Sequence, residues 1–568
     1  MGKRERGAPV KPAHRANEIG AIHKDPGGKL NVLLVFPNTY FVGMSNLGFH
    51  AIYAALNSLE HVRCERAFMP DESSRGVASV QMPLSIESGD MPSRFDVIAF
   101  SMPFENDYPN LVRFLKLSGI AIERDGRSVG GPLVVAGGCA VSANPEPLAT
   151  FVDAFLIGDG ERAACEVAAL LFEAKEKRLD RRDLLPRLAE LDGVYAPEFF
   201  APEYGPDGAV LAIRGLGGRD TVGRRATSRE ELVPARTVVF TEDTEFGHLG
   251  LVEAARGCPR SCSFCMTAFC SRPARFLSAE SILNAAELVK EHRPAVGLLG
   301  SAVADHPDLL DILSGLLSAG MGVTVSSLRA DRINPQMLDL LRRGGQQTIT
   351  IAPEAGEERL RAALSKPCSD EQLFEAAAQV ASAGFPVLKL YFMVGLPGES
   401  LEDVEKIVSL VKQMKHGLRK RSSGKRSVMI NVSVGSFVPK AHTPFQWEPM
   451  LVPGELSRRI RTVRAGLSGT RGVSAHSDVP KWAFVQGVLS RGDRRCSRLV
   501  SALAETDFDW QTAHRMVDVN PDFYALRERP RDEVFPWAHI VTGVPMDELW
   551  RNLESYRSQM RRISSAAY

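Results

Sequence analysis

The stretch Leu251–Cys265, LVEAARGCPRSCSFC, places three cysteines directly after a short apolar segment. Cys258, Cys262 and Cys265 lie four and three positions apart, and Phe264 precedes the last of them. Structural zinc sites and ordinary iron–sulfur clusters take four protein ligands. Either a fourth ligand comes from elsewhere in the chain, or one coordination position is left open.

Zinc and redox chemistry fit these cysteines poorly. Cys270 is the nearest candidate for a fourth zinc ligand, but its distance of five residues from Cys265 fits no common zinc pattern. A redox dithiol is disfavoured because there are three cysteines and no thioredoxin-like context. The remaining interpretation is that three thiolates hold three corners of a cubane iron–sulfur cluster and leave the fourth iron free.

The three cysteines follow the first strand of a predicted βα series. Apolar segments typical of strands lie at Leu251–Arg256, Val296–Gly300, Gly322–Ser327, Thr348–Ala352, Val387–Val394 and Val428–Phe437. Helical segments follow the first five of these strands: Ser278–His292, Asp308–Ser318, Pro335–Arg343, a helix that ends near Ser365, and Ser400–Met414. Six strands of this kind predict an open (β/α)6 barrel, whose chemistry belongs at the carboxyl ends of the strands.

An earlier series of strands predicts a second α/β unit. Strands are expected at Leu30–Phe36, Asp96–Ser101, Leu133–Ala136 and Ala154–Ile157, and helices at Leu47–Leu59 and Tyr108–Leu117. This alternation indicates a doubly wound, Rossmann-like domain with ligands beyond the carboxyl ends of its strands. The segments expected at that edge are Pro37–Tyr40, Met102–Glu105, Gly137–Cys139 and Gly158–Glu161.

The predicted organisation has five parts. Residues 1–27 are expected to be a disordered tail, 28–180 the Rossmann-like domain, 181–245 a connector with a few extra strands, 246–450 the barrel, and 451–568 a helical accessory domain. Between Leu451 and Val500 there are ten Lys or Arg residues against three acids.

The composition is that of a soluble globular protein. The chain has 568 residues, is 44% hydrophobic and 24% charged, and carries a formal net charge of +1. No apolar run approaches the roughly 20 residues needed to span a bilayer, and no secretory signal is recognisable. Nine cysteines are too few and too scattered for a disulfide framework, so a reducing cytoplasm is expected. The isolated cysteines are predicted to be small buried side chains: Cys64, Cys139, Cys165, Cys368 and Cys496.

The spacing Cys-x-x-x-Cys-x-x-Cys, with an aromatic residue before the last cysteine, resembles the signature of the radical S-adenosylmethionine (SAM) superfamily. The resemblance implies that Cys258, Cys262 and Cys265 bind a 4Fe–4S cluster and that SAM occupies its open iron. One electron from the cluster then cleaves SAM and releases a 5′-deoxyadenosyl radical. Such an enzyme needs a reductant, for example flavodoxin or ferredoxin.

Other strand ends are similar to the SAM site of that superfamily. The resemblance assigns SAM contacts to Phe264, Gly300, Ser301, Ser327, Arg329, Glu354, Met393 and Gly395. The alternatives are structural: Ser326 and Ser327 are helix caps beside a solvated Arg329, or Glu354 is paired with Arg359 or Arg361.

A Rossmann-like domain before the barrel resembles the cobalamin-binding class of the superfamily, in an uncharacterised bacterial branch. The similar segments are Tyr40–Gly48, Ser326–Arg329, Ala352–Gly356, Lys389–Glu399, Phe437–Lys440 and Arg527–Pro530. The Asp-x-His-x-x-Gly triplet that supplies the lower cobalt ligand does not occur in residues 1–180, and His50 and His61 are predicted to be ordinary residues. Cobalamin binding therefore stays open, and it is expected to occur without a histidine ligand.

The resemblance favours methyl transfer or another radical modification. The alternatives are a methylthiotransferase-like enzyme acting on RNA or protein, and a non-catalytic iron–sulfur scaffold. A second cluster on Cys64, Cys139 and Cys165 is disfavoured because these cysteines are spread over a hundred residues. The substrate is open between a small molecule, RNA and protein. The basic segment 411–430 is either an RNA contact or a solvated loop.

Overall fold

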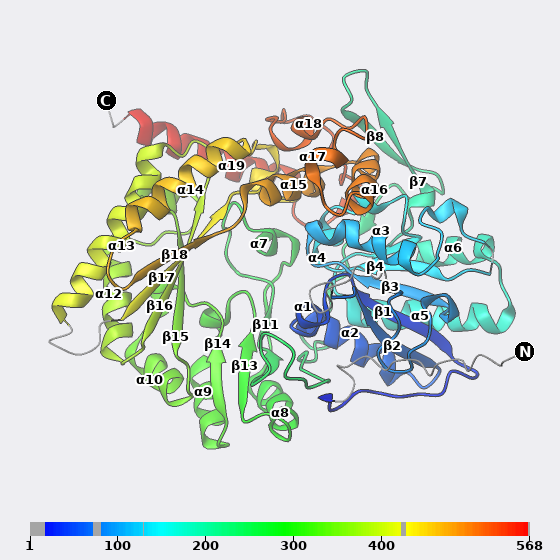
Figure 1. Cartoon of the computed structure of the whole chain (residues 1–568), viewed down its shortest axis with the longest axis horizontal. Helices are drawn as coiled ribbons and strands as arrows, with labels where there is room; N and C mark the ends of the chain where they lie inside the picture. Colours follow the sequence, from blue (N-terminus) through cyan, green and yellow to red (C-terminus); the bar gives the residue numbers. More distant parts are fainter. Residues whose placement is uncertain (1–16, 72–80, 129, 422–427, 566–568) are drawn as a thin grey trace, which may run out of the picture.

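The fold is described from a computed structural model of the chain, which describes residues 17–71, 81–128, 130–421 and 428–565. Figure 1 shows two α/β units side by side, with the C-terminal helices lying across both. None of the helices within these ranges has the length and apolar character needed to cross a membrane. The predicted arrangement, a Rossmann-like domain, a βα barrel and a helical C-terminal region, is confirmed.

The Rossmann-like domain is built on a six-stranded sheet in the order β2-β1-β3-β4-β5-β6. Its strands are β1 (Leu30–Phe36), β2 (Val62–Phe68), β3 (Val97–Ser101), β4 (Leu133–Gly137), β5 (Ala154–Leu156) and β6 (Val194–Tyr195). All neighbours are parallel except β5 and β6. The order reverses between β1 and β3, which is where doubly wound sheets form their ligand crevice.

Helices cover both faces of this sheet. On one face lie α2 (Leu47–Ser58) and α5 (Gly160–Lys177), whose apolar residues pack on the even-numbered residues of β1. On the other face lie α3 (Tyr108–Leu117) and, from the far end of the chain, α15 (Pro480–Arg491) and α16 (Ser497–Glu505). The C-terminal region therefore completes the core of the N-terminal domain.

Strand β2 was not predicted because its sequence, VRCERAF, alternates charged and apolar residues. All seven residues are nevertheless buried. The charges are paired: Arg66 forms ion pairs with Glu87 at 2.6 Å and with Glu18 at 2.7 Å, and Arg63 pairs with Asp90 at 3.0 Å. A buried charge is tolerated when it is paired and hydrogen-bonded, and these partners lie far away in the sequence.

The prediction of a disordered tail is wrong for residues 17–27, whereas residues 1–16 lie outside the described part of the chain. Ile19 forms a backbone bridge to Phe240. The backbone N–H of Ile22 donates to the Tyr53 hydroxyl at 2.8 Å, and the Lys24 ammonium donates to three backbone carbonyls between residues 57 and 62. This segment is a strap along the Rossmann-like domain.

The chain between the two units forms small elements. They are α6 (Arg181–Glu190), strand β6, the hairpin of β7 (Phe200–Tyr204) and β8 (Val210–Gly215), and β9 (Val222–Gly223), which pairs with β19 (Ile540–Val541). The last pairing joins this part of the chain to the C-terminal region.

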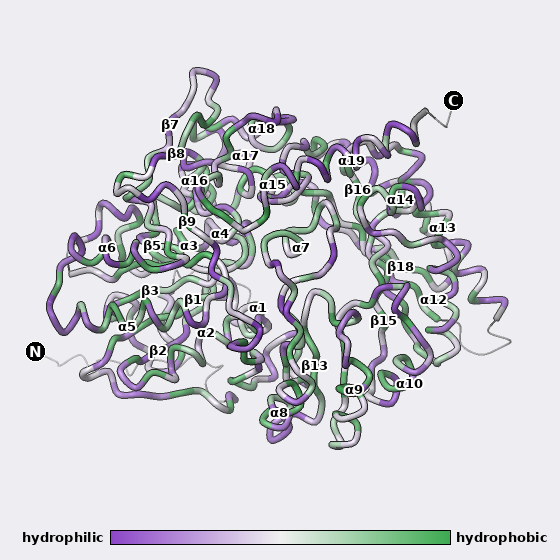
Figure 2. Tube along the Cα trace, turned by 180° about the vertical axis from the view of Figure 1, so that it is seen from behind, coloured by the Kyte–Doolittle hydropathy of each residue, from purple (hydrophilic) through white to green (hydrophobic). Residues whose placement is uncertain are grey.

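The barrel has parallel strands in two sheets, β10-β13-β14 and β15-β16-β17-β18. The bounds are β10 (Gly250–Glu253), β13 (Ala295–Leu299), β14 (Gly322–Val325), β15 (Thr348–Glu354), β16 (Val387–Val394), β17 (Met429–Ser436) and β18 (Val473–Ser477). Bridges from Val323 to Gly345 and from Leu328 to Ile351 connect the two sheets. In Figure 2, hydrophobic residues run along strands such as β13.

Helices pack on the outside of these strands. They are α8 (Ala279–Lys290), α9 (Leu309–Ser318), α10 (Pro335–Arg343), α12 (Asp370–Ser382), α13 (Leu401–Arg421) and α14 (Pro453–Leu467). The short helix α11 (Glu358–Ala363) instead contributes Leu360 and Ala363 to a separate core with Trp447 and Trp537. Ser278 caps α8 as predicted, because its side chain accepts from the backbone N–H of Ser281.

The prediction ended the barrel strands at Phe437, but the sheet has one more strand. After α14 the chain forms β18, which pairs in parallel with β17. Its sequence, VSAHS, is short and half polar, so it lacks the apolar run by which the other strands are recognised.

The remaining C-terminal helices are α17 (Trp510–Ala513), α18 (Pro521–Ala525) and α19 (Met546–Ser565). Trp447 and Trp537 are fully buried and form an aromatic cluster with Phe535. This cluster also takes in Phe269, in the short helix α7 (Met266–Cys270) behind the cysteines. The C-terminal region therefore packs against the helix that follows the three cysteines.

Candidate functional site

The cysteine loop begins at a glycine that no other residue replaces easily. Gly257 has φ +79°, and a Cβ there would lie 2.2 Å from the backbone oxygen of Ser271. The loop is closed at its base, where β11 (Ala255–Arg256) pairs with β12 (Arg275–Phe276). Its middle is held by the backbone N–H of Ser263, which donates to the carbonyl of Leu364 at 3.1 Å.

The three cysteines of the loop line one cavity of about 170 Å³ at the carboxyl ends of the barrel strands. We call it the cysteine cavity. Its walls also include Phe264, Ser301, Ser327, Arg329, Glu354 and Lys366. All three thiols are free of disulfide bonds. Burial raises the pKa of Cys262 to about 11, and the neighbouring thiols of Cys265 and Cys258 act in the same direction.

The three thiols are not arranged as ligands of a single ion. Among the residues that the structure describes, no group of three or more His, Cys, Asp or Glu side chains is arranged around one metal ion. Thiolates that each bind a different iron of one cubane do not converge on a point, as zinc ligands must. The three free thiols on one cavity wall fit such a cluster.

A fourth cysteine lies on the same cavity. Cys368 was predicted to be an isolated buried residue, but it lines the cysteine cavity. Burial raises the pKa of its thiol, and the charges that act on it belong chiefly to Arg361, Asp331 and Arg329. The Lys366 ammonium acts on this thiol as it does on that of Cys262, so Cys368 belongs to the surroundings of the same cavity.

Five of the eight residues predicted to contact SAM line the cysteine cavity: Phe264, Ser301, Ser327, Arg329 and Glu354. Glu354 has φ +69°, a strained conformation for a non-glycine residue. Its carboxylate accepts from the Lys366 ammonium at 2.6 Å. The alternative partners are wrong, because Arg361 pairs with Asp370 and Arg359 lies nearest Glu357.

Three predicted contacts lie elsewhere. Gly300 lines the second cavity described below. Met393 packs against the aromatic cluster behind the loop. Gly395 has φ +86°, and a Cβ there would lie 2.6 Å from the Leu456 side chain, so the packing of α14 already requires a glycine. Neither Met393 nor Gly395 lines the cysteine cavity, and their contact with SAM stays a prediction.

Charged groups brace the rim of the cysteine cavity. The Arg260 guanidinium, inside the cysteine loop, donates to the Asp305 carboxylate at 3.1 Å, and Arg332 pairs with the same carboxylate at 3.0 Å. Burial alone would raise the pKa of Asp305, but the bonds from these guanidinium groups lower it below its ordinary value. Asp305 therefore stays ionised and anchors the loop to the neighbouring strand end.

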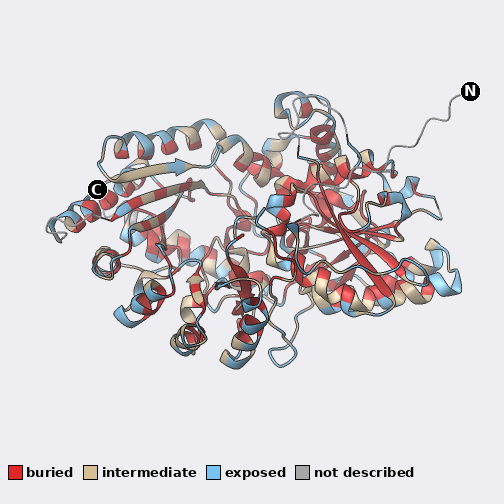
Figure 3. Ribbon diagram, turned by 60° about the horizontal axis from the view of Figure 1, so that its bottom comes forward, coloured by how far each residue is buried: buried red, intermediate tan, exposed pale blue. Residues whose placement is uncertain are grey.

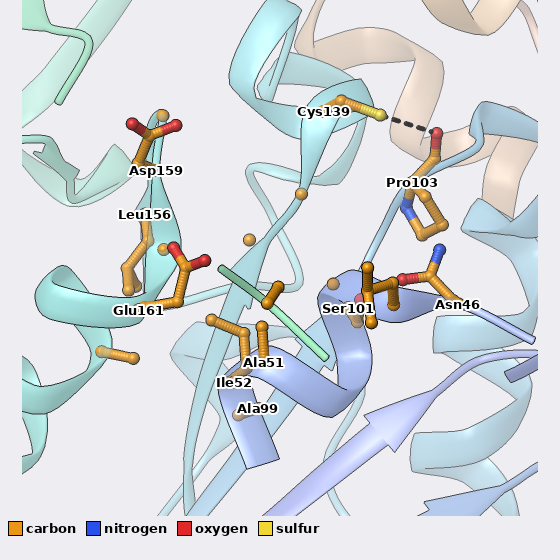
Figure 4. Close-up of a pocket in the computed structure, with 18 of the residues that line it drawn as sticks. Asn46, Ala51, Ile52, Ala99, Ser101, Pro103, Cys139, Leu156, Asp159 and Glu161 are labelled. Carbon is orange, nitrogen blue, oxygen red and sulfur yellow. Dashed lines mark hydrogen bonds between the residues drawn. The ribbon is translucent and has the colours of Figure 1, made fainter. Parts of the chain in front are cut away.

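A larger cavity of about 550 Å³ opens inside the Rossmann-like domain. We call it the Rossmann cavity. It lies between the sheet and the helices α2 and α5, and its walls include Val32, Ala51, Ala99, Ala164 and Ala168 (Figure 4). It reaches the carboxyl edge of the sheet at Ser101, Pro103, Gly137, Cys139 and Gly158, as the strand ends predicted.

The glycines of this edge are needed for backbone packing. Gly138 has φ +118°, and a Cβ there would lie 2.7 Å from the carbonyl oxygen of Met102. Gly158 has φ +109°, and a Cβ would lie 2.1 Å from the carbonyl oxygen of Arg225. The backbones of Met102 and Arg225 thus lie close to the two glycines, which have no side chains to fill the opening.

Ion pairs clamp this edge to the cysteine loop. Arg256, one residue before Gly257, pairs with Glu161 at 2.6 Å, and Arg275 pairs with Asp159. Asp159 and Glu161 flank the start of α5, and both lie at the mouth of the Rossmann cavity (Figure 4). Cys139, on the other side of the mouth, donates its thiol hydrogen to the carbonyl of Pro103.

The two cavities meet. Ser301 lines both of them, and the wall of the Rossmann cavity also includes Gly257 and Gly300. A ligand at the mouth of the Rossmann cavity is therefore separated from the cysteine cavity by little more than the backbone of the cysteine loop and of the β13 strand end.

Comparisons with known proteins match both units. A model of the N-terminal part of radical SAM proteins matches residues 48–197, and the model of the radical SAM superfamily matches residues 252–411, together more than half of the chain. The chain belongs to the radical SAM superfamily. Its cofactors are accordingly a 4Fe–4S cluster and SAM, and it is a radical SAM enzyme.

Individual relatives of this radical SAM enzyme are distant. MJ0966, an uncharacterised protein of Methanocaldococcus jannaschii, is 27% identical over 470 residues, which cover 82% of this chain and 90% of that protein. The cytidylyl-2-hydroxyethylphosphonate methyltransferase of Streptomyces wedmorensis is 23% identical over 343 residues, 55% of this chain and 60% of that enzyme. The radical SAM methyltransferase TsrM of Kitasatospora setae, solved with cobalamin and a [4Fe–4S] cluster, has a TM-score of 0.50 at 12% identity, covering 94% of this chain and all of that one. The last likeness concerns the fold.

Sequence reasoning missed several residues of the site. Lys366 gave no signal because lysine after a helix is most often a solvated residue. Arg256 and Arg275 were missed because their partners lie about a hundred residues away. The Rossmann cavity was missed because it is a space between helices and sheet, which no residue type in the sequence indicates.

Proposed function

We propose that this radical SAM enzyme transfers a methyl group and that it holds a cobalamin at the Rossmann cavity. The observation that carries the proposal is the Rossmann cavity itself, which opens beside the cysteine loop and shares Ser301 with the cysteine cavity. A cofactor there lies next to SAM, which is the arrangement that methyl transfer between them requires.

The walls of the Rossmann cavity suit cobalamin. This cofactor has a broad corrin ring and a nucleotide tail, so it needs a wide opening and a deep slot. The small rim residues leave the opening free, and the space between the sheet and α2 and α5 forms the slot. Its volume of about 550 Å³ is that of a small-molecule site and would take the nucleotide tail, with the corrin ring at the open mouth.

A cobalamin in this cavity would be held without a histidine ligand. No histidine is among the described residues that line the Rossmann cavity. His50 is buried in α2, where burial lowers its pKa to about 4, and its ring is hydrogen-bonded to the carbonyl of Met44. This agrees with the absence of the Asp-x-His-x-x-Gly triplet.

The cysteine cavity would hold the cluster and SAM. When bound, the cluster supplies the electron that cleaves SAM, and the cobalamin carries a methyl group. Cys258, Cys262 and Cys265 would hold the cluster. Lys366 and Arg329 would supply positive charge for the carboxylate of SAM, and Phe264 an aromatic face for its adenine. An external reductant provides the electron.

Methyl transfer is favoured over methylthiolation by the positions of the other cysteines. A second cluster needs three further thiolates. Cys64 is buried in β2, Cys139 lies at the end of β4, and Cys165 is on α5, where its thiol donates to the carbonyl of Ala55. These three residues lie on separate elements and form no ligand group.

The test is anaerobic reconstitution with iron, sulfide and hydroxocobalamin. We expect a stoichiometric cobalamin spectrum of the base-off type and formation of 5′-deoxyadenosine or of demethylated SAM after reduction. Ala164→Phe, which fills the Rossmann cavity, is expected to abolish cobalamin binding and to leave the cluster absorbance unchanged.

Ala169→Phe is the matched control, because Ala169 lies on the exposed side of the same helix. It is expected to bind cobalamin like the wild type. Cobalamin binding that is equal in both variants, or absent from the wild type, contradicts the proposal.

A further inference from the structure

The strands β15 to β18 have one face that neither cavity explains. Alternate residues of β16 and β17, such as Leu390 and Val432, pack into the core beneath α12, α13 and α14. Because side chains alternate along a strand, the residues between them point to the opposite face, toward the inside of the barrel. We call this the inner face.

The strand register arranges the inner face in rows. Lys389 on β16 lies beside Asn431 on β17, and Asn431 lies beside Ser474 on β18; we call these three the lysine row. Two residues further along, Tyr391 lies beside Ser433, and Ser433 beside His476; these three are the tyrosine row. Both rows consist of polar groups, although the opposite face of the same strands is apolar.

These polar groups have few partners of their own. The Lys389 ammonium lies 4.8 Å from the centre of the Tyr391 ring, and no carboxylate among the described residues is within ion-pair distance of it. Tyr391 is 37% exposed. The Ser474 hydroxyl donates to the Asn431 side chain at 2.8 Å. Hydrogen-bonding capacity is thus left over on this partly accessible face.

Lys389 carries the fixed positive charge of the two rows. Glu354, at the cysteine-cavity end of β15, is neutralised by Lys366. Asp478, beyond the end of β18, accepts two hydrogen bonds from Ser436. Asp478 keeps its charge but lies beyond the strand end, so Lys389 is the charged group within the rows themselves.

The inner face leads into the cysteine cavity. Ile351 pairs with Leu390 and, after an irregularity in the register, Glu354 pairs with Phe392, so Tyr391 lies opposite Ala352 and Pro353, which line that cavity. The tyrosine row therefore borders the cavity, and the lysine row lies roughly 7 Å deeper along the strands. Four strands make a face about 14 Å wide, which suits a small molecule or one end of one.

We propose that the inner face binds a small-molecule substrate through an oxyanion, a phosphoryl or carboxylate group, which is held by Lys389 with Asn431 and Ser474. The ammonium supplies the charge, the amide and hydroxyl supply hydrogen bonds, and the rest of the substrate extends past the tyrosine row toward SAM. This inference rests on the proposed function, because it takes the cysteine cavity as the place of reaction.

The test measures binding of inorganic phosphate and, in a parallel arm, of acetate to the reconstituted enzyme. Lysine amines are reductively methylated with and without the anion, and the modified residues are located by mass spectrometry. We expect the anion to protect Lys389 and to leave Lys412, on the outer surface of α13, unprotected. The arm that protects better identifies the phosphoryl or the carboxylate group.

Lys389→Met is expected to weaken anion binding in calorimetric titration at least about tenfold, since a lost charge-assisted hydrogen bond costs about 1.5 kcal/mol or more. Lys412→Met is the matched control and is expected to bind like the wild type. The inference is overturned if anion binding does not saturate or if Lys389→Met binds anions with wild-type affinity. It is also overturned if RNA, and not a small anion, protects Lys389 from methylation.

Reductive cleavage of SAM without substrate is measured in the same samples. A wild-type enzyme that cleaves SAM but does not bind anions at Lys389 contradicts this inference alone. An enzyme that does not cleave SAM at all contradicts the proposed function.

Discussion

The cysteine cavity and the Rossmann cavity share Ser301, yet they are built by opposite means. The cysteine cavity is crowded with reactive and charged side chains, such as Cys262, Glu354 and Lys366. The Rossmann cavity is defined by side chains that are small or missing, such as Ala51, Ala99 and Gly138. The first cavity offers reactive side chains to a ligand, whereas the second offers space.

The two sheets beneath these cavities differ in the same sense. In Figure 3 the strands of the Rossmann-like domain are largely buried, whereas buried and half-buried residues alternate along barrel strands such as β15 and β17. A fully covered sheet makes room for a ligand by omitting side-chain volume. A sheet with one half-buried face presents the polar side chains of that face to a ligand. Substitutions that remove chemistry should therefore act on one cavity, and substitutions that add volume should act on the other.

The largest effect is expected for Cys262→Ala. Removal of one of three thiolates leaves the cluster without a full set of protein ligands, so we expect loss of the visible absorbance of the cluster and SAM cleavage reduced to background. Iron and sulfide analysis together with the 5′-deoxyadenosine assay measures this. Cobalamin binding at the Rossmann cavity should be unchanged.

Cys368→Ala is the matched control, because Cys368 lines the same cavity but lies outside the cysteine loop, after α11. The cluster and SAM cleavage should persist in this variant. Loss of the cluster in Cys368→Ala would show that a fourth thiolate is a ligand and that the open coordination position does not exist.

Gly138→Ala tests the opposite kind of cavity. A Cβ at φ +118° and 2.7 Å from the Met102 carbonyl oxygen must displace the rim, which should cost about 2–4 kcal/mol of folding stability. We expect a lower melting temperature and weakened cobalamin binding, with the cluster retained. Gly217→Ala, where a Cβ meets nothing within 4 Å, should melt like the wild type; equal melting of the two variants would contradict the steric argument.

Lys366→Met separates SAM binding from cluster binding. The Lys366 ammonium pairs with Glu354 and faces the cysteine cavity. Its loss should lower the affinity for SAM about tenfold, as for one charge-assisted hydrogen bond, while the cluster absorbance stays. Equilibrium dialysis with SAM measures the affinity. Lys406→Met, on the exposed side of α13, should have no effect, and an unchanged affinity in Lys366→Met would remove the residue from the SAM site.

The smallest effect concerns neither cavity. His539 is buried against Tyr195 and Phe200, and burial lowers its pKa from 6.5 to about 4. Between those pH values the unfolded chain binds a proton that the folded chain does not, so stability is lost as the pH falls below 6.5. His539→Phe takes up no proton and should lose about 2 kcal/mol less stability between pH 7 and pH 5.

Thermal melting of the apoprotein at both pH values measures this difference. His416→Phe, at an exposed position of α13, is the control and should behave like the wild type. An acid sensitivity that is equal in His539→Phe and in the wild type contradicts the assignment of a neutral buried histidine.

The differences between the predicted and observed elements have one physical origin. Strands β1, β4 and β16 were predicted because each is a run of apolar residues that is recognisable in isolation. Strands β2 and β18 were not, because Arg63 and Arg66 are neutralised by distant carboxylates and because β18 gains its partners only beside β17. The strap at residues 17–27 likewise has its partners in remote segments such as Phe240.

The sequence by itself determined the local chemistry: three cysteines in one loop, an aromatic residue beside them, glycines at strand ends and the order of the βα units. These features depend on residues close together in the chain, so their spacing is visible without the fold. Only the tertiary structure decided that Lys366 faces Glu354, that the C-terminal helices complete the N-terminal core, and that two cavities meet at Ser301. The reason is that an ion pair, a shared core and an empty space each depend on distances between segments that the chain order does not contain.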